Sequence, residues 1–228
     1  MGPRTRLLAL VSITNHLRRL ERDMDFQKAL VADTVRLLGD GGAEYSRENY
    51  SYGSTPFHTW HAVFRLPAVA SALDRCLHRE NSAAPVQSQS HVAVFGASHG
   101  MLAFNAALTF GVRTAGYELL PYLHGVATGL AADHKLPDSL LSFTRGDMLD
   151  ASVGRAAVVL LTSQCWDTDL RAAVYRKLRE EAPCGCVVVD YVSELDTVPG
   201  FQACGSFVGQ VSWDPDLKFH LYKRVEVE

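Results

Sequence analysis

From His91 onward, short apolar runs alternate with segments of helical periodicity. The strands predicted from these runs cover residues 91–95, 113–117, 140–144, 156–161 and 186–191. The run at 156–161 is apolar throughout, as expected for a central strand of a parallel sheet that is buried on both faces. Helices are predicted between the strands, at residues 101–110, 123–134 and 167–181.

The carboxyl-terminal end of the chain predicts a hairpin. Residues 207–213 and 217–223 alternate between apolar and polar positions, and the turn residues Asp214-Pro215-Asp216 separate them. Strand–helix alternation that ends in a hairpin predicts an α/β fold. We expect a seven-stranded, mostly parallel Rossmann-like sheet with an antiparallel C-terminal hairpin.

The residues before His91 predict a helical region. Residues 1–40 predict two helices, and the buried side of the first is expected to carry Leu7, Leu8, Val11 and Leu17. Residues 43–60 are polar and aromatic and predict an ordered loop, whereas 66–77 predict a helix. Residues 81–90 are of low complexity and are a candidate linker. We therefore expect two parts, an N-terminal helical cap with a lid loop (1–85) and an α/β domain (86–228).

Composition excludes several classes of protein. Hydrophobic residues make up 47% and charged residues 21% of the 228 residues, which is typical of a folded chain. The net charge of −3, from 22 basic and 25 acidic residues, makes a nucleic-acid partner unlikely. The longest dense apolar run, 156–161, is far too short to span a membrane.

The cysteines and the amino terminus bear on the cellular compartment. The five cysteines are odd in number and irregular in spacing, so they predict no disulfide framework. Without a visible secretory signal, we expect a cytoplasmic or nuclear protein that is not secreted. The first twenty residues contain four arginines and no acid, which also resembles a mitochondrial transit peptide. Cys184-Gly185-Cys186 lacks a second Cys/His pair at zinc spacing, so no metal site is predicted.

The loop after the first predicted strand is a candidate ligand site. Ligands of open parallel sheets bind beyond the carboxyl ends of the strands. Gly96 and Gly100 allow a ligand to approach the backbone there, and Glu118, at the end of the second strand, could accept hydrogen bonds from ribose hydroxyls. The loop lacks the G-x-G-x-x-G pattern of dinucleotide sites. The pattern favours a nucleoside-type ligand, and the alternative is an ordinary strand–turn–helix with a solvated Glu118.

The end of the third predicted strand extends this series. Asp147 could accept a hydrogen bond from an exocyclic amine such as that of adenine, and Met148 could cover the base. The alternative is that Asp147 is an ordinary turn residue.

These segments together resemble a known enzyme family. The motifs Gly96…Gly100, Gly116-Tyr117-Glu118, Gly146-Asp147-Met148 and 161–166 are similar to those of class I S-adenosylmethionine-dependent methyltransferases, over about residues 91–224. The loop Tyr52–Phe57 and the segment 162–166 narrow the resemblance to the histone-lysine methyltransferases that lack a SET domain and to their smaller lysine-methylating relatives.

The resemblance implies a cofactor, S-adenosylmethionine, and roles for individual residues. Thr162, Trp166 and Tyr52 would be catalytic, the first two as walls of an acceptor channel. The cofactor would be bound by Tyr52, Gly53, Thr55, Phe95, Gly96, Ala97, Ser98, Gly100, Glu118, Leu119, Asp147, Met148 and Thr162. Phe57 and Trp60 are further candidate walls, with core packing as the alternative for Trp60. His58 and His61 are expected to form a polar rim.

Two positions depart from the family pattern. Val94 stands where the family usually has an acid, and Ser98 replaces the middle glycine of the loop. The expected function is methylation of a lysine in a protein substrate. The alternatives are methylation of a small-molecule acceptor and a catalytically degenerate, methyltransferase-like binding module. The tail 183–228 has three basic and seven acidic residues, and it is the expected docking surface for a basic protein segment.

Overall fold

The computed structural model describes residues 1–39, 45–80 and 91–226, so the candidate linker 81–90 lies outside the described residues. Seven strands form one sheet of order β3-β2-β1-β4-β5-β7-β6. The strands are β1 (His91–Phe95), β2 (Thr114–Glu118), β3 (Leu141–Arg145), β4 (Ala156–Leu161), β5 (Val187–Asp190), β6 (Phe201–Gly209) and β7 (Leu217–Arg224). Strands β1 to β5 pair in parallel, and β7 pairs antiparallel with both β5 and β6. The predicted fold class is therefore confirmed.

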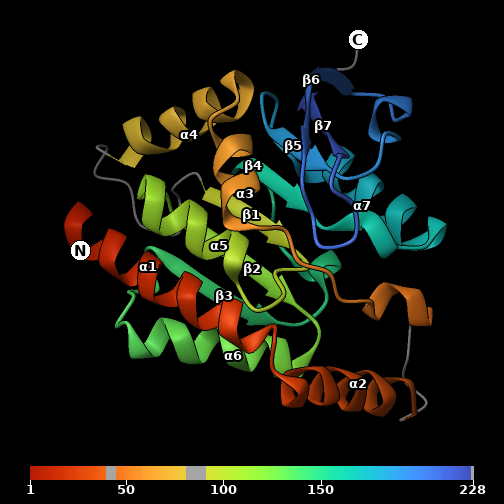
Figure 1. Cartoon of the computed structure of the whole chain (residues 1–228). Coiled ribbons are helices and arrows are strands. Elements are labelled where there is room, and N and C mark those ends of the chain that lie inside the picture. The colour runs from red at the N-terminus through yellow and green to blue at the C-terminus, as the bar shows by residue number, and fades with distance from the viewer. Residues whose placement is uncertain (40–44, 81–90, 227–228) are drawn as a thin grey trace.

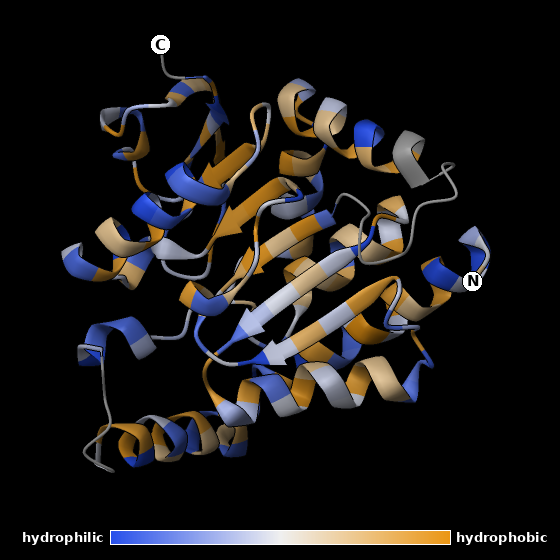
Figure 2. Ribbon diagram, turned by 180° about the vertical axis from the view of Figure 1, so that it is seen from behind, coloured by the Kyte–Doolittle hydropathy of each residue, from blue (hydrophilic) through white to orange (hydrophobic). Residues whose placement is uncertain are grey.

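The centre of the sheet is its most apolar part. β1 and β4 lie side by side, and the residues from Val158 to Leu161 are fully buried. The central strands are largely hydrophobic in Figure 2. Burial on both faces explains why these strands are apolar runs, since each face must pack against helices.

Helices cover the two faces of the sheet unequally (Figure 1). The buried side chains of one face pack with several helices, and those of the other face pack with one. The first group comprises α1 (Pro3–Leu20), α3 (Phe57–Phe64), α4 (Pro67–Glu80), α5 (Met101–Asn105) and α6 (Pro121–Asp133). The other face is covered by α7 (Thr168–Glu181), while α2 (Met24–Gly39) packs on the loop before α6 and on α6 itself. Within the described residues, no helix is long and apolar enough to cross a membrane.

The buried face of α1 differs from the prediction. Leu17 is buried, but Leu7, Leu8 and Val11 are 59%, 65% and 52% exposed. The helix instead buries the row formed by Ala9, Leu10, Ile13, Thr14 and Leu17. Residues 7–11 are apolar on most sides of the helix, so periodicity alone could not select the side that packs against α5 and the short helix η3 (Ala106–Phe110).

Two element boundaries also differ. The predicted loop 43–60 contains the first turn of α3, which begins at Phe57 after Pro56, because Trp60, Val63 and Phe64 bury one apolar face. The first strand of the hairpin is β6 at 201–209 rather than 207–213. Residues beyond Gly209 leave the sheet, and Ser212 exchanges hydrogen bonds with Ser54 of the loop before α3 instead.

Candidate functional site

A cavity of about 280 Å³ lies at the carboxyl ends of the parallel strands. This is the edge at which open α/β sheets bind ligands. The predicted cofactor and acceptor residues that line it are Tyr52, Gly53, Thr55, Gly96, Ala97, Ser98, Glu118, Leu119, Asp147, Met148, Thr162 and Trp166. Phe95 and Gly100 are not part of the lining. Phe95 is fully buried in the core beneath the loop.

The loop that follows β1 is held against the end of β4. The hydroxyl of Thr162 donates hydrogen bonds to the carbonyls of Phe95, at 3.0 Å, and Gly96, at 3.1 Å. Gly96 has φ 71°, and a Cβ there would lie 2.2 Å from Thr162 Oγ1. The position therefore requires glycine for two reasons: its positive φ angle, and the lack of space for a Cβ atom. In this structure the Thr162 hydroxyl positions the loop.

Ser98 occupies a strained position in the same loop. Its φ is 54°, in the left-handed region that residues other than glycine rarely adopt. Its hydroxyl oxygen is buried and has no hydrogen-bond partner among the described residues. The departure from glycine at this position thus leaves both backbone strain and a buried polar atom without a partner among the described residues.

Glu118 is the most deeply buried acid of the cavity wall, at 7% exposure. Its two carboxylate oxygens accept hydrogen bonds from the backbone N–H groups of Ser98, at 2.6 Å, and Leu120, at 2.8 Å. Burial raises the pKa of this carboxyl, while the backbone hydrogen bonds oppose the rise. A carboxylate can accept about four hydrogen bonds, so Glu118 keeps some capacity to accept one from a ligand hydroxyl.

Asp147 is connected to the N-terminal part of the chain. Its Oδ1 accepts a hydrogen bond from the backbone N–H of Leu149 at 2.7 Å, and its Oδ2 accepts one from the hydroxyl of Tyr45. Tyr45 and Met148 also line the cavity. An acid, an aromatic ring and a thioether therefore surround one end of the cavity.

A third polar group joins three separate segments beside the cavity. Glu21, just after α1, accepts hydrogen bonds from the hydroxyl of Tyr52 at 2.7 Å and from His99 Nε2 at 3.0 Å. Burial opposes ionisation of Glu21, but the hydrogen bonds from His99 and Tyr52 outweigh it and lower its pKa. Glu21 was not predicted as a site residue, because nothing in the helical pattern of residues 1–20 points toward the sheet edge.

The loop over the cavity is attached to the C-terminal hairpin. Ser54 N–H donates to Ser212 Oγ at 3.0 Å, and Ser212 N–H donates to the Ser54 carbonyl at 2.9 Å. The hydroxyls of Thr55 and Tyr191 are 2.7 Å apart. Tyr191 also packs edge-on against Trp213, with ring centroids 5.9 Å apart. These contacts cover one side of the cavity with aromatic rings.

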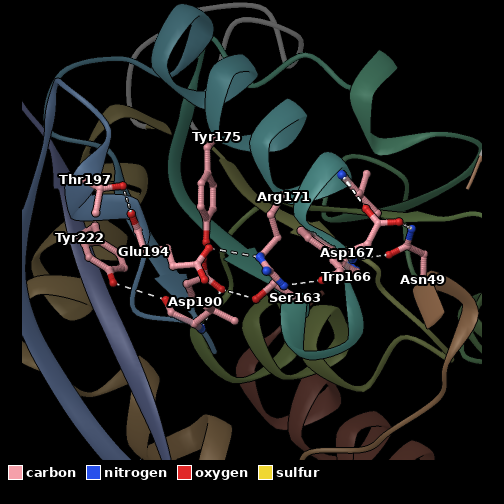
Figure 3. Close-up of polar contacts among 12 residues, drawn as sticks. Asn49, Ser163, Trp166, Asp167, Arg171, Tyr175, Asp190, Glu194, Thr197 and Tyr222 are labelled. Atoms are coloured by element: carbon pink, nitrogen blue, oxygen red, sulfur yellow. Dashed lines mark hydrogen bonds and ion pairs between the residues drawn. The ribbon is translucent and has the colours of Figure 1, made fainter. Parts of the chain in front are cut away.

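A buried acid, Asp190, holds the segment that follows β4 by hydrogen bonds (Figure 3). Asp190, at the end of β5, is fully buried and accepts hydrogen bonds from the hydroxyls of Ser163 and Tyr175, the latter at 2.7 Å. Burial raises the pKa of Asp190, and these hydrogen bonds oppose the rise. Ser163 directly follows Thr162, so this network fixes the segment that ends in Trp166.

A second network in Figure 3 ties the N-terminal loop to the start of α7. Asp167 accepts hydrogen bonds from Ser46 at 2.6 Å and Asn49 at 2.7 Å, and Asn49 Oδ1 accepts the Asp167 N–H at 2.7 Å. The hydrogen bonds to Ser46 and to the Leu170 N–H lower the pKa of Asp167. Asn49 also lines the cavity, so this loop is part of the site.

Several aromatic and histidine candidates lie elsewhere. Trp60 is fully buried in the core, and Phe57 packs against that core, so neither lines the cavity. His61 stacks on Phe57 and Phe110, away from the cavity, and His58 does not line it either. No group of three or more potential metal ligands occurs among the described residues.

Part of the cavity wall was not predicted from the sequence. Tyr191, Ser212 and Trp213 line the cavity although 207–213 was predicted as a strand. Their position at the cavity depends on the path of the chain after β5 and β6. The alternation of apolar and polar residues does not predict that path. Among the described lining residues, the ionisable acids are Glu118 and Asp147, and neither lysine nor arginine is present.

No family model matches the sequence, and no curated protein sequence matches it. Magnesium protoporphyrin IX methyltransferase from Synechocystis PCC 6803, with bound SAM, is 13% identical with a TM-score of 0.53, over 93% of this chain and 97% of that chain. The same enzyme with bound SAH gives 12% identity and a TM-score of 0.51, over 84% and 99%.

A third similar structure is that of yhhF from Escherichia coli, a candidate methyltransferase. It is 12% identical with a TM-score of 0.54, over 77% of this chain and 88% of that chain. At identities this low, the structural similarity shows the fold alone. That fold agrees with the strand order and the terminal hairpin of this chain. The chain therefore has the seven-stranded, Rossmann-like fold of the class I methyltransferases.

Proposed function

We propose that this chain is an S-adenosylmethionine-dependent methyltransferase whose acceptor is a lysine side chain of a protein. The observation that carries the cofactor assignment is the convergence of Glu118, Asp147 and the Gly96 loop on one cavity at the switch point of the sheet. Glu118 keeps some capacity to accept hydrogen bonds from ribose hydroxyls, and Asp147 with Met148 suits an adenine.

The acceptor side suits an amine. Bound S-adenosylmethionine would supply an activated methyl group, so the protein must align the acceptor and exclude water. The aromatic rings of Trp166, Tyr191 and Trp213 would do this, because desolvation favours the neutral, nucleophilic form of an amine. Their faces also accommodate a cationic amine before it loses its proton. The absence of lysine and arginine from the described lining disfavours a phosphate-rich acceptor.

A small-molecule acceptor is the second candidate. It is favoured by the hydrogen bonds between Ser54 and Ser212, which close the loop over the cavity and restrict access by a folded protein surface. The Synechocystis neighbour is itself named for a small-molecule substrate, a porphyrin. The lysine assignment rests on the short segments 52–57 and 162–166 together with the aromatic wall.

Cofactor binding is tested first, by calorimetry with S-adenosylmethionine. We expect Glu118→Ala to weaken binding at least about tenfold, the loss expected for a hydrogen bond to a buried charge. Glu118→Gln preserves the size of the side chain and should weaken binding less. Glu180→Ala, at an exposed site on α7, is the control and should bind normally. Absence of wild-type binding at millimolar cofactor would leave the binding-module alternative and contradict both enzyme assignments.

The acceptor is tested with S-adenosylmethionine labelled on its methyl group. Purified protein is incubated with histones, with total protein extract and with a metabolite pool, and labelled products are separated by size. Label on lysines of protein bands supports the first candidate. Label confined to the small-molecule fraction would contradict it and support the second.

A further inference from the structure

The side of α1 that faces away from the core combines exposed apolar residues with arginines. Leu7, Leu8 and Val11 are each more than half exposed. At about 3.6 residues per turn, the exposed residues on this side fall within a sector of about 100° around the helix axis. We call them the outer face of α1, and they are Arg4, Leu7, Leu8, Val11, Asn15 and Arg18. The helix runs along the outside of the molecule in Figure 1, so this face is accessible to a partner.

The outer face of α1 is positively charged. Residues 1–20 contain four arginines and no acid, although the whole chain has a net charge of −3. Arg4, Arg18 and Arg19 are exposed, and none of them forms an ion pair within the part of the chain that the structure describes. Arg4 precedes the apolar residues by about one turn, and Arg18 follows them by about two turns. The outer face therefore complements a partner that is both apolar and anionic.

Helix α2 provides a comparison within the same chain. Its large apolar residues that are more than 60% exposed are Met24, Val31 and Val35. The two bases of α2, however, pair with its two acids: Lys28 with Asp25 at 2.9 Å, and Arg36 with Asp33 at 2.5 Å. The exposed apolar residues of α2 thus lie on a helix without net charge, whereas those of α1 lie between unpaired arginines.

An anionic lipid surface fits the outer face of α1 better than other partners. A helix that lies in a membrane interface buries its apolar side chains at the level of the acyl chains, while its long basic side chains extend to the lipid phosphates. A nucleic-acid backbone would satisfy the arginines but would leave the three apolar residues without a contact. A symmetric contact between two copies of the chain would bring identical, positively charged faces together, which repel each other.

We propose that the outer face of α1 binds the surface of an anionic lipid membrane, with Leu7, Leu8 and Val11 at the level of the acyl chains and Arg4 and Arg18 at the lipid phosphates. The opposite side of the helix stays packed on the core of the protein. Binding is peripheral, because no helix among the described residues can cross a membrane. The surface lies outside the cavity, so the proposal holds whichever acceptor the cavity takes.

The end of α1 is connected to the cavity. Glu21 directly follows the helix and is hydrogen-bonded to Tyr52 and His99, both of which line the cavity. Attachment of α1 to a membrane therefore holds the cavity close to the lipid surface.

Binding is tested by sedimentation of the full-length chain with lipid vesicles. One set of vesicles contains phosphatidylcholine with about 30% phosphatidylserine, and the other contains phosphatidylcholine alone. We expect binding to be at least about tenfold stronger on the anionic vesicles, because each arginine near such a surface contributes about fivefold. Raising the salt concentration from about 50 to 500 mM should weaken the binding, since salt screens these charges.

Paired variants separate the two kinds of contact. Arg4→Gln/Arg18→Gln removes charge, Leu7→Gln/Leu8→Gln removes apolar surface, and each should weaken binding to anionic vesicles at least about tenfold. Val31→Gln/Val35→Gln, on the exposed side of α2, is the matched control and should change it less than about twofold. All six side chains are exposed, so the fold should be retained, which urea denaturation checks. The two α1 variants act through different chemistry, so each tests the face independently of the other.

Several results would overturn the proposal. These are a wild-type chain that binds neither kind of vesicle, one that binds both equally, and an α2 variant that loses as much binding as Leu7→Gln/Leu8→Gln. Dimers that Leu7→Gln/Leu8→Gln dissociates, found by sedimentation velocity in place of vesicle binding, would assign the face to a second copy of the chain. Binding of a single-stranded RNA that only the arginine variant loses would assign it to nucleic acid.

Discussion

At the residue scale, the site combines predictable and unpredictable side chains. Glu118 and Asp147 could be located from the sequence, because the ends of neighbouring parallel strands meet at one edge of a sheet. Glu21, His99 and Tyr191 could not be assigned in the same way. Their roles depend on how a helix end, a loop and a strand end converge in space, and neither periodicity nor spacing encodes that convergence.

Ser98 gives a prediction about stability. Its left-handed φ of 54° costs about 1–2 kcal/mol for a residue with a Cβ, and its hydroxyl is unsatisfied. We expect Ser98→Gly to raise the free energy of unfolding by about 1 kcal/mol, measured by urea denaturation. Ser206→Gly, at an exposed strand position in β6, is the control and should lower it instead, because glycine weakens an extended strand. A less stable Ser98→Gly variant would contradict this account of the loop.

At the element scale, strand positions were more predictable than helix faces and segment ends. Strands β1 and β4 are apolar because both of their faces are covered, and that pattern is local. The outward face of α1 depends on the shape of α5 and η3, which the local pattern does not contain. The shift of β6 toward Phe201 likewise reflects the departure of residues 210–213 from the sheet, where Ser212 contacts Ser54 of the loop before α3.

The faces of α1 are tested with paired substitutions. Ile13 is fully buried and Leu8 is 65% exposed. Ile13→Ala should therefore lower the free energy of unfolding by about 2–5 kcal/mol, through lost burial and a residual cavity. Leu8→Ala should change it by less than about 0.5 kcal/mol. Urea denaturation of both variants checks the assignment, and a larger loss for Leu8→Ala would restore the face predicted from the sequence.

The attachment of α1 to the cavity predicts a pH dependence of stability. The pKa of Glu21 in the folded protein lies below the value of 4.5 taken for the free group. Its ionised form therefore stabilises the fold above pH 4.5, and this contribution is lost as the pH falls through the lower, folded-state pKa. Thermal denaturation should show a wild-type advantage over Glu21→Gln at pH 6 that shrinks toward pH 3. A constant difference would show that the carboxylate is not held as described.

At the scale of the whole molecule, the sheet is assembled around one carboxyl-terminal edge that receives contributions from the full length of the chain. The mostly parallel sheet and its antiparallel terminal hairpin agree with the predicted alternation, so this part of the fold was predictable. The segments that cover the cavity were not predictable. Asn49 contacts the start of α7 and Ser54 contacts the segment after β6, and each pair is more than a hundred residues apart in the sequence. Pairings at that range leave no local pattern.

The closure of the cavity predicts an effect on exchange kinetics. Ser212→Ala removes the acceptor for Ser54 N–H while keeping the backbone hydrogen bond. We expect stopped-flow measurements with S-adenosylhomocysteine to show association and dissociation rates that both rise a few-fold, with a nearly unchanged equilibrium constant. Ser206→Ala, on the exposed part of β6, should leave both rates as in the wild type. An altered equilibrium constant with unchanged rates would contradict a gating role.

Two hydrogen bonds between Ser54 and Ser212 attach the loop before α3 to the segment between the last two strands, beside the cavity. If each round of methyl transfer must break the Ser54–Ser212 contacts to release its product, then the residence time of product limits turnover. The throughput of the protein would then be set at the far end of the chain from the helices that hold the other wall of the cavity. Selection for faster or slower turnover could act on residues 210–213 without altering any group that contacts the cofactor.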